Sequence, residues 1–180
     1  MFIGCIQWLM MIIVLASYQP GYNSSLHYVS SLGSGTTSII YNISIILFGI
    51  SIIFSSILLF KYIDFKIFNI SLFLTGVFII GVGIFNEDIR PFHGYMTAFA
   101  FLFAVFSAIL SYKVLNSPIS YLSIVLGIIS LVLLIVFFPY VGLPADSTIT
   151  FLGLGKGTLE RILIYTLMFW MLSFSISLTN

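Results

Sequence analysis

The residues best suited to acid–base chemistry lie close together near the middle of the chain. Glu87 and Asp88 precede Arg90, and His93 follows them in the same short stretch. An imidazole beside a carboxylate can transfer a proton, relay it, or supply part of a metal site. We take His93 as a candidate catalytic acid or base, with Glu87 as its partner. The alternative is an interfacial polar belt in which His93 is hydrogen-bonded to a loop carbonyl.

Further polar residues in three separate segments are grouped with this pair. The candidate substrate-binding residues are His27, Asp88, Glu160 and Arg161. Glu160 and Arg161 follow a glycine-rich stretch and open the last apolar run, so they should lie at the surface of a membrane. His27 and Asp88 lie in loops that the order of the apolar runs places on the same side of the membrane, so we expect all of these residues to converge there.

The charges of Glu160 and Arg161 suit the start of a helix differently. A carboxylate in the first turn is stabilised by the helix dipole, whereas a guanidinium is not. We therefore expect Arg161 to pair with an acid from another loop, namely Glu87, Asp88 or Asp146. The alternative is that Arg161 binds an anionic lipid head group.

The composition places this chain in a bilayer. Of its 180 residues, 61% are hydrophobic and 6% are charged, whereas soluble domains carry about 25% charged residues. The net charge of +1 gives no basic surface for nucleic acid. With one cysteine and two histidines, a structural zinc site is not expected. We predict no metal and no cofactor, and we expect membrane lipids rather than nucleic acid as partners.

Six apolar runs are long enough, or nearly so, to cross a membrane as helices. A span needs about 20 residues, and lipid offers no partner for unpaired backbone groups. We therefore predict an all-α integral membrane bundle of six transmembrane helices in a single domain, residues 1–180. Thr158 is expected to cap the last helix. The predicted helices cover residues 1–17, 37–60, 66–85, 91–113, 118–139 and 158–178.

The loops between these runs alternate between short and long. Residues 61–65 and 114–117 form tight turns on one side, whereas residues 18–36, 86–90 and 140–157 lie on the other. Lysine and arginine are almost evenly divided between the two sides, with the N-terminal amine adding to the short-loop side. We therefore expect a multi-pass cell-membrane protein whose short loops and both termini face the cytoplasm.

The order of these features resembles a prokaryotic family of membrane proteins called domain of unknown function 998. The residues that carry this resemblance are His27-Tyr28-Val29-Ser30-Ser31-Leu32-Gly33, Asn42, Gly49, Gly81-Val82-Gly83-Ile84-Phe85-Asn86-Glu87, His93 and Glu160-Arg161. The family often has an acidic residue where this chain has Ser31, which argues against a catalytic role at that position. The resemblance implies a six-helix membrane protein with a polar site built from three segments, and it implies no established activity.

Three functions are compatible with these patterns. The first is a small membrane subunit or scaffold that packs against other membrane proteins, because the predicted spans carry almost no charge and no soluble domain is evident. The second is a lipid-binding protein, or an enzyme acting on a lipid or lipid-linked substrate, at the outer interface. The third is a transporter, which normally shows charged groups or broken helices at mid-depth, and none is visible here.

Overall fold

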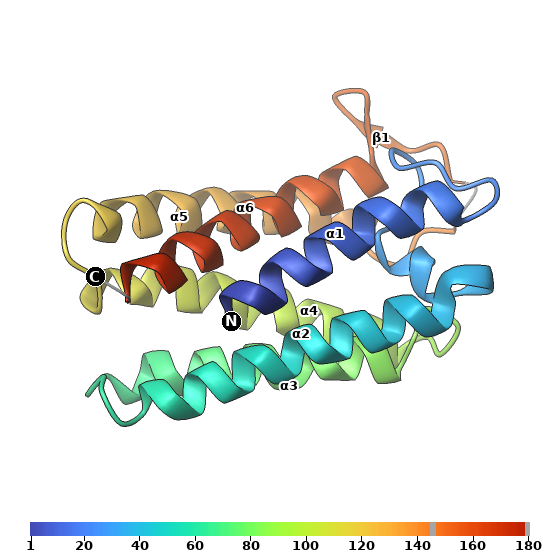
Figure 1. Cartoon of the computed structure of the whole chain (residues 1–180). Helices are drawn as coiled ribbons and strands as arrows, with labels where there is room; N and C mark the ends of the chain where they lie inside the picture. Colours follow the sequence, from blue (N-terminus) through green and yellow to red (C-terminus); the bar gives the residue numbers. More distant parts are fainter. Residues whose placement is uncertain (145–146, 179–180) are drawn as a thin grey trace.

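In a computed structural model, which describes residues 1–144 and 147–178, the chain forms a bundle of six α-helices (Figure 1). Short 3₁₀ turns and a two-stranded hairpin connect them. The helices are α1 (Phe2–Tyr18), α2 (Ser38–Leu59), α3 (Lys66–Ile84), α4 (Phe92–Leu110), α5 (Ile119–Phe137) and α6 (Lys156–Ser177). The hairpin pairs β1 (Thr150–Phe151) with β2 (Leu154–Gly155) in antiparallel register. The prediction of an all-α helical bundle is confirmed.

The helices follow one another around the bundle, and α6 closes it. Each helix packs against the next in sequence, while α6 also contacts α1 and α4. The span of α6 is the most buried of the five long ones, at 56%, compared with 22% for α5. The interior therefore forms around the last helix, where Trp170 and Phe174 are completely buried.

The two ends of the bundle differ as the loop lengths predict. The turns α2–α3 and α4–α5 lie at one end, toward which both chain ends also point (Figure 1). The N-terminal amine accordingly donates to Ser55 Oγ at 2.8 Å, near the end of α2. The long connections and the hairpin gather at the opposite end, which we call the loop end. This is where every candidate site residue lies.

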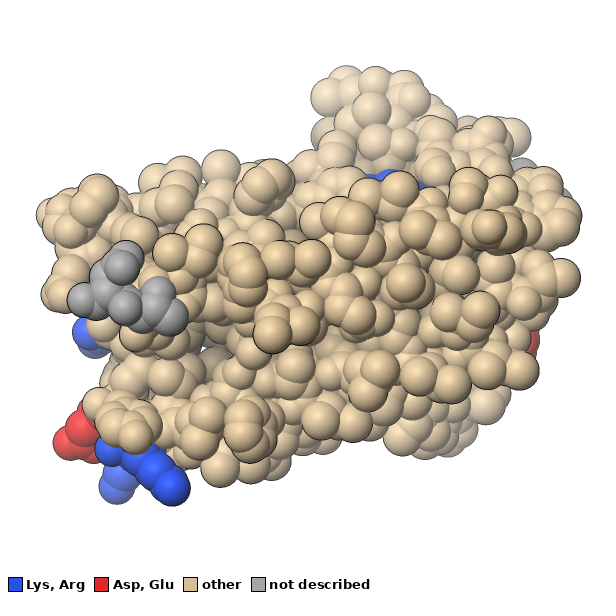
Figure 2. All heavy atoms as spheres, viewed as in Figure 1, with Lys and Arg blue, Asp and Glu red and all other residues tan. Residues whose placement is uncertain are grey.

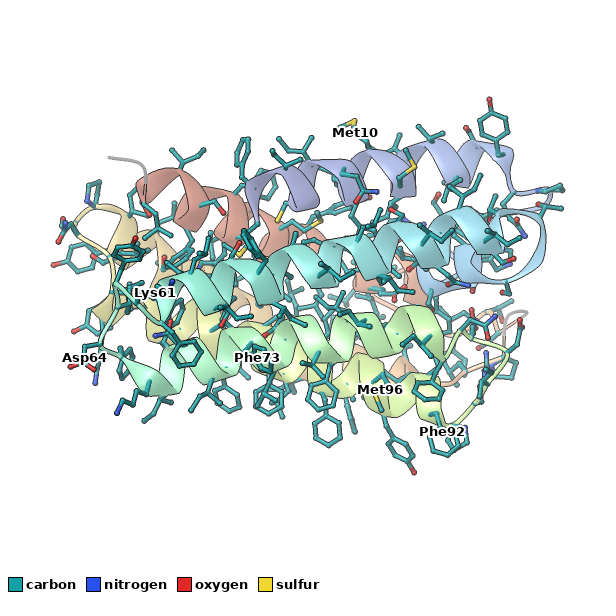
Figure 3. The ribbon with its side chains drawn as sticks, turned by 60° about the horizontal axis from the view of Figure 1, so that its bottom comes forward. Met10, Lys61, Asp64, Phe73, Phe92 and Met96 are labelled. Atoms are coloured by element: carbon teal, nitrogen blue, oxygen red, sulfur yellow. The ribbon has the colours of Figure 1, made fainter. Side chains whose placement is uncertain are left out.

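The lengths and surfaces of the helices are those of a multi-pass membrane protein. Five helices are long and apolar enough to span a membrane, and α1, at 17 residues, is a shorter apolar helix. A 19-residue helix such as α3 measures about 28 Å, close to the hydrocarbon thickness of a bilayer. One face of the molecule is almost free of charge between the ends (Figure 2). Lys61 and Asp64 lie at the short-turn end, and Phe92 lies at the opposite end (Figure 3).

The start of α6 differs from the prediction. The helix begins at Lys156 rather than Thr158, and the Thr158 side chain does not cap it. Instead, the carbonyl oxygen of Ser25 accepts the backbone N–H groups of Gly157 and Thr158 at 2.9 and 3.2 Å. A Cβ at Gly157 would collide with the carbonyl of His27. Glycine is therefore needed for the first long loop to reach the helix and satisfy its free N–H groups.

A pair of glycines, one on each helix, sets the spacing between α2 and α3. A Cβ built on Gly49 would lie 2.8 Å from the carbonyl oxygen of Gly76, and one on Gly76 would lie 2.8 Å from that of Gly49. The two backbones are thus in direct contact at mid-depth. Close approach through small residues is a common way for helices to pack where hydrophobic burial from water does not drive association.

Candidate functional site

The first long loop, residues 19–37, lies over the N-terminal turn of α6 and is bonded to it by side chains. The backbone N–H of Val29 donates to Glu160 Oε2 at 2.5 Å. Glu160 is only 3% exposed, so the bond lies inside the protein. Charge-assisted hydrogen bonds to a buried carboxylate are among the stronger polar contacts in proteins. The loop is therefore part of the bundle's packed interior.

Arg161 binds the same loop by a different set of contacts. Its Nη1 donates to the carbonyls of Ser24 at 2.5 Å, His27 at 3.3 Å and Gly157 at 3.0 Å, and its Nη2 donates to the hydroxyl of Tyr22. The expected bond to Glu87 or Asp88 is not present, and Asp146 lies outside the described residues. Several loop carbonyls converge at this point, so the guanidinium donates its hydrogen bonds to them rather than to a carboxylate.

Glu87 is the centre of a second polar group at the loop end. Its Oε2 accepts the Ser31 hydroxyl at 2.5 Å, and its Oε1 pairs with Arg90 Nη2 at 2.6 Å. This joins the first long loop to the α3–α4 loop. Within the described ranges, Glu87–Arg90 is the one ion pair between side chains.

His93 lies in the first turn of α4 and is 7% exposed. Its Nδ1 is 2.7 Å from the carbonyl oxygen of Phe85, so that nitrogen must carry the proton. Nε2 lies 3.4 Å from the hydroxyl of Thr97. Across the described part of the chain, no hydrogen bond joins His93 to Glu87. The geometry therefore matches the alternative in which His93 is bonded to a loop carbonyl.

A cavity of about 430 Å³ opens at the loop end between α4 and the end of α5. We call it the mouth. His93, Glu87 and Glu160 all line it, although they are not bonded to one another. The other polar side chains that line the mouth are Tyr28, Ser30, Arg90, Tyr95 and Thr97. Three of the six candidate residues thus share one cavity.

A deeper and smaller cavity of about 70 Å³ lies among α1, α2, α3, α4 and α6. We call it the inner cavity, and most of its lining is apolar, including Trp8, Phe48, Ala104 and Met171. Three residues line both the inner cavity and the mouth, namely Ser30, Thr97 and Glu160. The two cavities therefore adjoin at these side chains. Both are largely apolar, and the mouth carries the larger number of polar and charged side chains.

His27 and Asp88 line a third, more open hollow of about 520 Å³. Glu87 and Arg90 line both this hollow and the mouth, so their ion pair lies on the boundary between the two. His27 Nδ1 accepts the backbone N–H of Asn23 at 3.0 Å, which stabilises the loop. All six candidate residues thus lie at the loop end. Glu87, His93 and Glu160 line the mouth, His27 and Asp88 line the open hollow, and Arg161 is bonded to the first long loop.

The comparison with protein families agrees with the resemblance noted from the sequence. The family described as Protein of unknown function (DUF998) matches residues 2–177. The chain belongs to this family. No curated protein matches the chain. No solved structure matches it either. Membership of DUF998 brings no named activity with it.

Two residues of this DUF998 protein that sequence reasoning did not select also shape the site. The Tyr28 hydroxyl donates to the carbonyl of Tyr140 and accepts the N–H of Leu143 at 3.1 Å. Lys156 is 1% exposed, donates to the carbonyl of Pro144, and lies 5.2 Å from the centre of the Tyr28 ring. A tyrosine near the end of an apolar run is typical of an interfacial anchor, and a lysine in a glycine-rich loop is typical of an exposed cation, so neither pattern indicates burial.

The buried tyrosines of the first long loop act as donors at every physiological pH. Burial is the main cause that raises the pKa of Tyr22 and of Tyr28 to about 12. Both hydroxyls therefore remain protonated and hold the loop in place. Among the described residues, no group of three or more His, Cys, Asp or Glu side chains could hold a metal ion.

Proposed function

We propose that this protein binds a lipid or a similar single-chain amphipathic molecule inside its helical bundle. The polar end of the ligand would occupy the mouth, and its apolar tail would extend into the inner cavity. One observation carries this proposal: the two cavities share Ser30, Thr97 and Glu160 as lining residues. A cavity that carries charged and polar side chains beside an almost wholly apolar one matches the two ends of a lipid.

The lining of the inner cavity supports an apolar occupant. Ala100 and Ala104 of α4 leave room opposite the longer side chains Leu167 and Met168 of α6. Binding sites for small molecules are usually concave, largely apolar and equipped with a few polar groups that set orientation. From Glu160 to Met171, the helical rise gives a depth of about 16 Å along α6. This is enough for a substantial length of acyl chain.

Filling the inner cavity tests the proposal. The protein is purified in a mild detergent, and retained lipids are identified by native mass spectrometry. Ala104→Phe should lower the amount of retained lipid strongly, because the ring would occupy the space of the tail. The control is Val125→Phe on the exposed surface of α5, where the side chain is 51% exposed. Retention that is equal in the two variants would contradict a lipid site in this cavity.

Catalysis on a lipid or lipid-linked substrate is the enzymatic form of this proposal, with His93 as acid or base and Glu87 as its partner. The contacts favour binding over catalysis. His93 Nδ1 is taken by Phe85, and Glu87 is paired with Arg90. Replacing His93 or Glu87 with Ala would abolish turnover of a substrate while preserving assembly if these residues are catalytic. Misassembly of both variants would assign them a structural role.

The subunit or scaffold function and the transporter function stay predictions. A chain that purifies as a monodisperse monomer, without a stoichiometric partner, would argue against the subunit. We also propose that the protein resides in the cell membrane with the short turns and both termini in the cytoplasm. Lys61, Lys66 and Lys113 at the short-turn end support this orientation. A C-terminal reporter that is active only outside the cell would contradict it.

A further inference from the structure

The junction between the mouth and the inner cavity carries polar groups that the protein itself leaves without partners. Ser30 is 7% exposed, Tyr41 is 3% exposed, and both line the inner cavity. Within residues 1–144 and 147–178, neither hydroxyl makes a hydrogen bond. Glu160 Oε2 is bonded to Val29, but its second carboxylate oxygen has no partner in the same ranges. Buried polar groups are normally hydrogen-bonded, so these three groups offer hydrogen-bonding capacity to a ligand in the cavity.

The charges around this junction are unequal. Glu160 is the acidic side chain that lines both cavities, while the neighbouring Arg161 directs its guanidinium to the loop carbonyls and to Tyr22, and Lys156 donates to the carbonyl of Pro144. At the mouth, the charge of Arg90 is compensated by Glu87 at 2.6 Å. A buried carboxylate that lacks a full set of partners is costly. A ligand that brought a second negative charge to this point would add to that cost, whereas a cation would reduce it.

We propose that the site selects an amphiphile whose head group is a primary ammonium, with the ammonium at Glu160 and the chain in the inner cavity. This inference rests on the proposed function. A primary ammonium has three N–H donors and no acceptor. The inner cavity offers three acceptors, which are the free oxygen of Glu160 and the hydroxyl oxygens of Ser30 and Tyr41. The Thr97 hydroxyl, which also lines both cavities, lies 3.4 Å from His93 Nε2.

Trp8 allows direct detection of the chain in its cavity. It lines the inner cavity, and its ring is stacked on Phe48 at a centroid distance of 5.1 Å. The chain contains only one other tryptophan, Trp170, which does not line either cavity. A bromine at the end of an alkyl chain quenches indole fluorescence on contact. Quenching that is lost in Trp8→Phe would therefore report occupancy of the inner cavity.

The experiment titrates the protein in a neutral detergent with three brominated dodecyl amphiphiles that differ only in head group: amine, alcohol and carboxylate. We expect the amine to bind roughly tenfold or more tightly than the carboxylate, as for a charge-assisted hydrogen bond in a desolvated site. Glu160→Gln should remove this preference while retaining binding of the alcohol. Asp64→Asn, at the opposite end of the bundle (Figure 3), should keep the preference.

The possible failures separate the two proposals. If the carboxylate quenches Trp8 at concentrations equal to or lower than the amine, the head-group inference is overturned and lipid binding stands. If Glu160→Gln keeps the preference for the amine, Glu160 is not the recognising group and the inference is likewise overturned. If no amphiphile quenches Trp8, while circular dichroism shows a folded protein, both the head-group inference and the proposed function fail.

Discussion

The backbone N–H of Val29 donates to the carboxylate of Glu160 at 2.5 Å, which joins two residues 131 positions apart in the sequence. This bond connects the first long loop to the most buried helix. It occupies one oxygen of Glu160 and leaves the other without a hydrogen-bond partner among the described residues. The carboxylate of Glu160 therefore has a structural role and a proposed ligand-binding role, and mutation can separate the two.

Replacing Glu160 should separate these two roles. Glu160→Gln retains an oxygen that can accept the Val29 N–H, so thermal stability in detergent should change little. Glu160→Ala leaves that N–H unpaired inside the protein, which should cost about 1–3 kcal/mol. Thermal unfolding followed by circular dichroism measures the difference. An alanine variant as stable as the glutamine variant would contradict a structural role for the bond.

Arg161 should be essential for holding the first long loop. Arg161→Ala removes all of its hydrogen bonds to the loop and leaves carbonyls unpaired, so we expect a loss of roughly 3 kcal/mol. Arg161→Lys should be intermediate, because one ammonium cannot reproduce the planar fork of donors. Limited proteolysis within residues 19–29 would measure loop release together with thermal stability.

The matched control for Arg161 is Arg90→Ala. The Arg90 side chain is 46% exposed and pairs with Glu87, so its removal should cost about 1 kcal/mol or less. If Arg90→Ala destabilised the protein as much as Arg161→Ala, the guanidinium contacts of Arg161 would not be the reason for its effect.

The same small substitution should have opposite effects at two helical glycines. Gly49→Ala places a Cβ 2.8 Å from the Gly76 carbonyl, so α2 and α3 must separate and stability should fall. Gly94→Ala meets nothing within 4 Å and should stabilise the protein by up to about 1 kcal/mol, through helix propensity. Thermal unfolding compares the two. Equal effects on the unfolding temperature would show that the close contact between α2 and α3 at Gly49 does not contribute to stability.

The buried tyrosines should make the protein unstable in alkali. Tyr22 and Tyr28 have pKa values of about 12 in the folded protein, whereas an unfolded tyrosine ionises near the model value of 10.0. Folding therefore stabilises the protonated hydroxyls fully below pH about 10, and this contribution is lost as the pH rises to about 12. Unfolding temperatures measured across this window should fall, and less steeply in Tyr28→Phe. An equally steep fall in that variant would exclude a contribution from Tyr28.

Local properties of the sequence were sufficient for the fold class. A run of about 20 apolar residues forms a helix in lipid whatever lies elsewhere in the chain. The predicted helices therefore differ from the observed ones by only one or two residues at most ends. The loop end was also predictable, because helices that cross a membrane alternate in direction and place their connections on opposite sides in turn.

The contacts within the loop end were not predictable in the same way. Thr158 was expected to cap α6, but Ser25, far away in the sequence, supplies the capping carbonyl. The sequence predicts that Arg161 pairs with an acid, but its guanidinium donates to loop carbonyls instead. Each outcome depends on how closely two backbones approach, and glycines such as Gly157 permit that approach only in the assembled fold.

The sequence by itself determined that this chain is a membrane-spanning helical bundle with its ionisable groups at one end, because hydropathy and span length act over a single helix. Only the tertiary structure decided that Glu160 lies between the mouth and the inner cavity while Arg161, the next residue, is occupied by a loop. Adjacent residues on a helix point about 100° apart, so their surroundings are set by the neighbouring helices and loops.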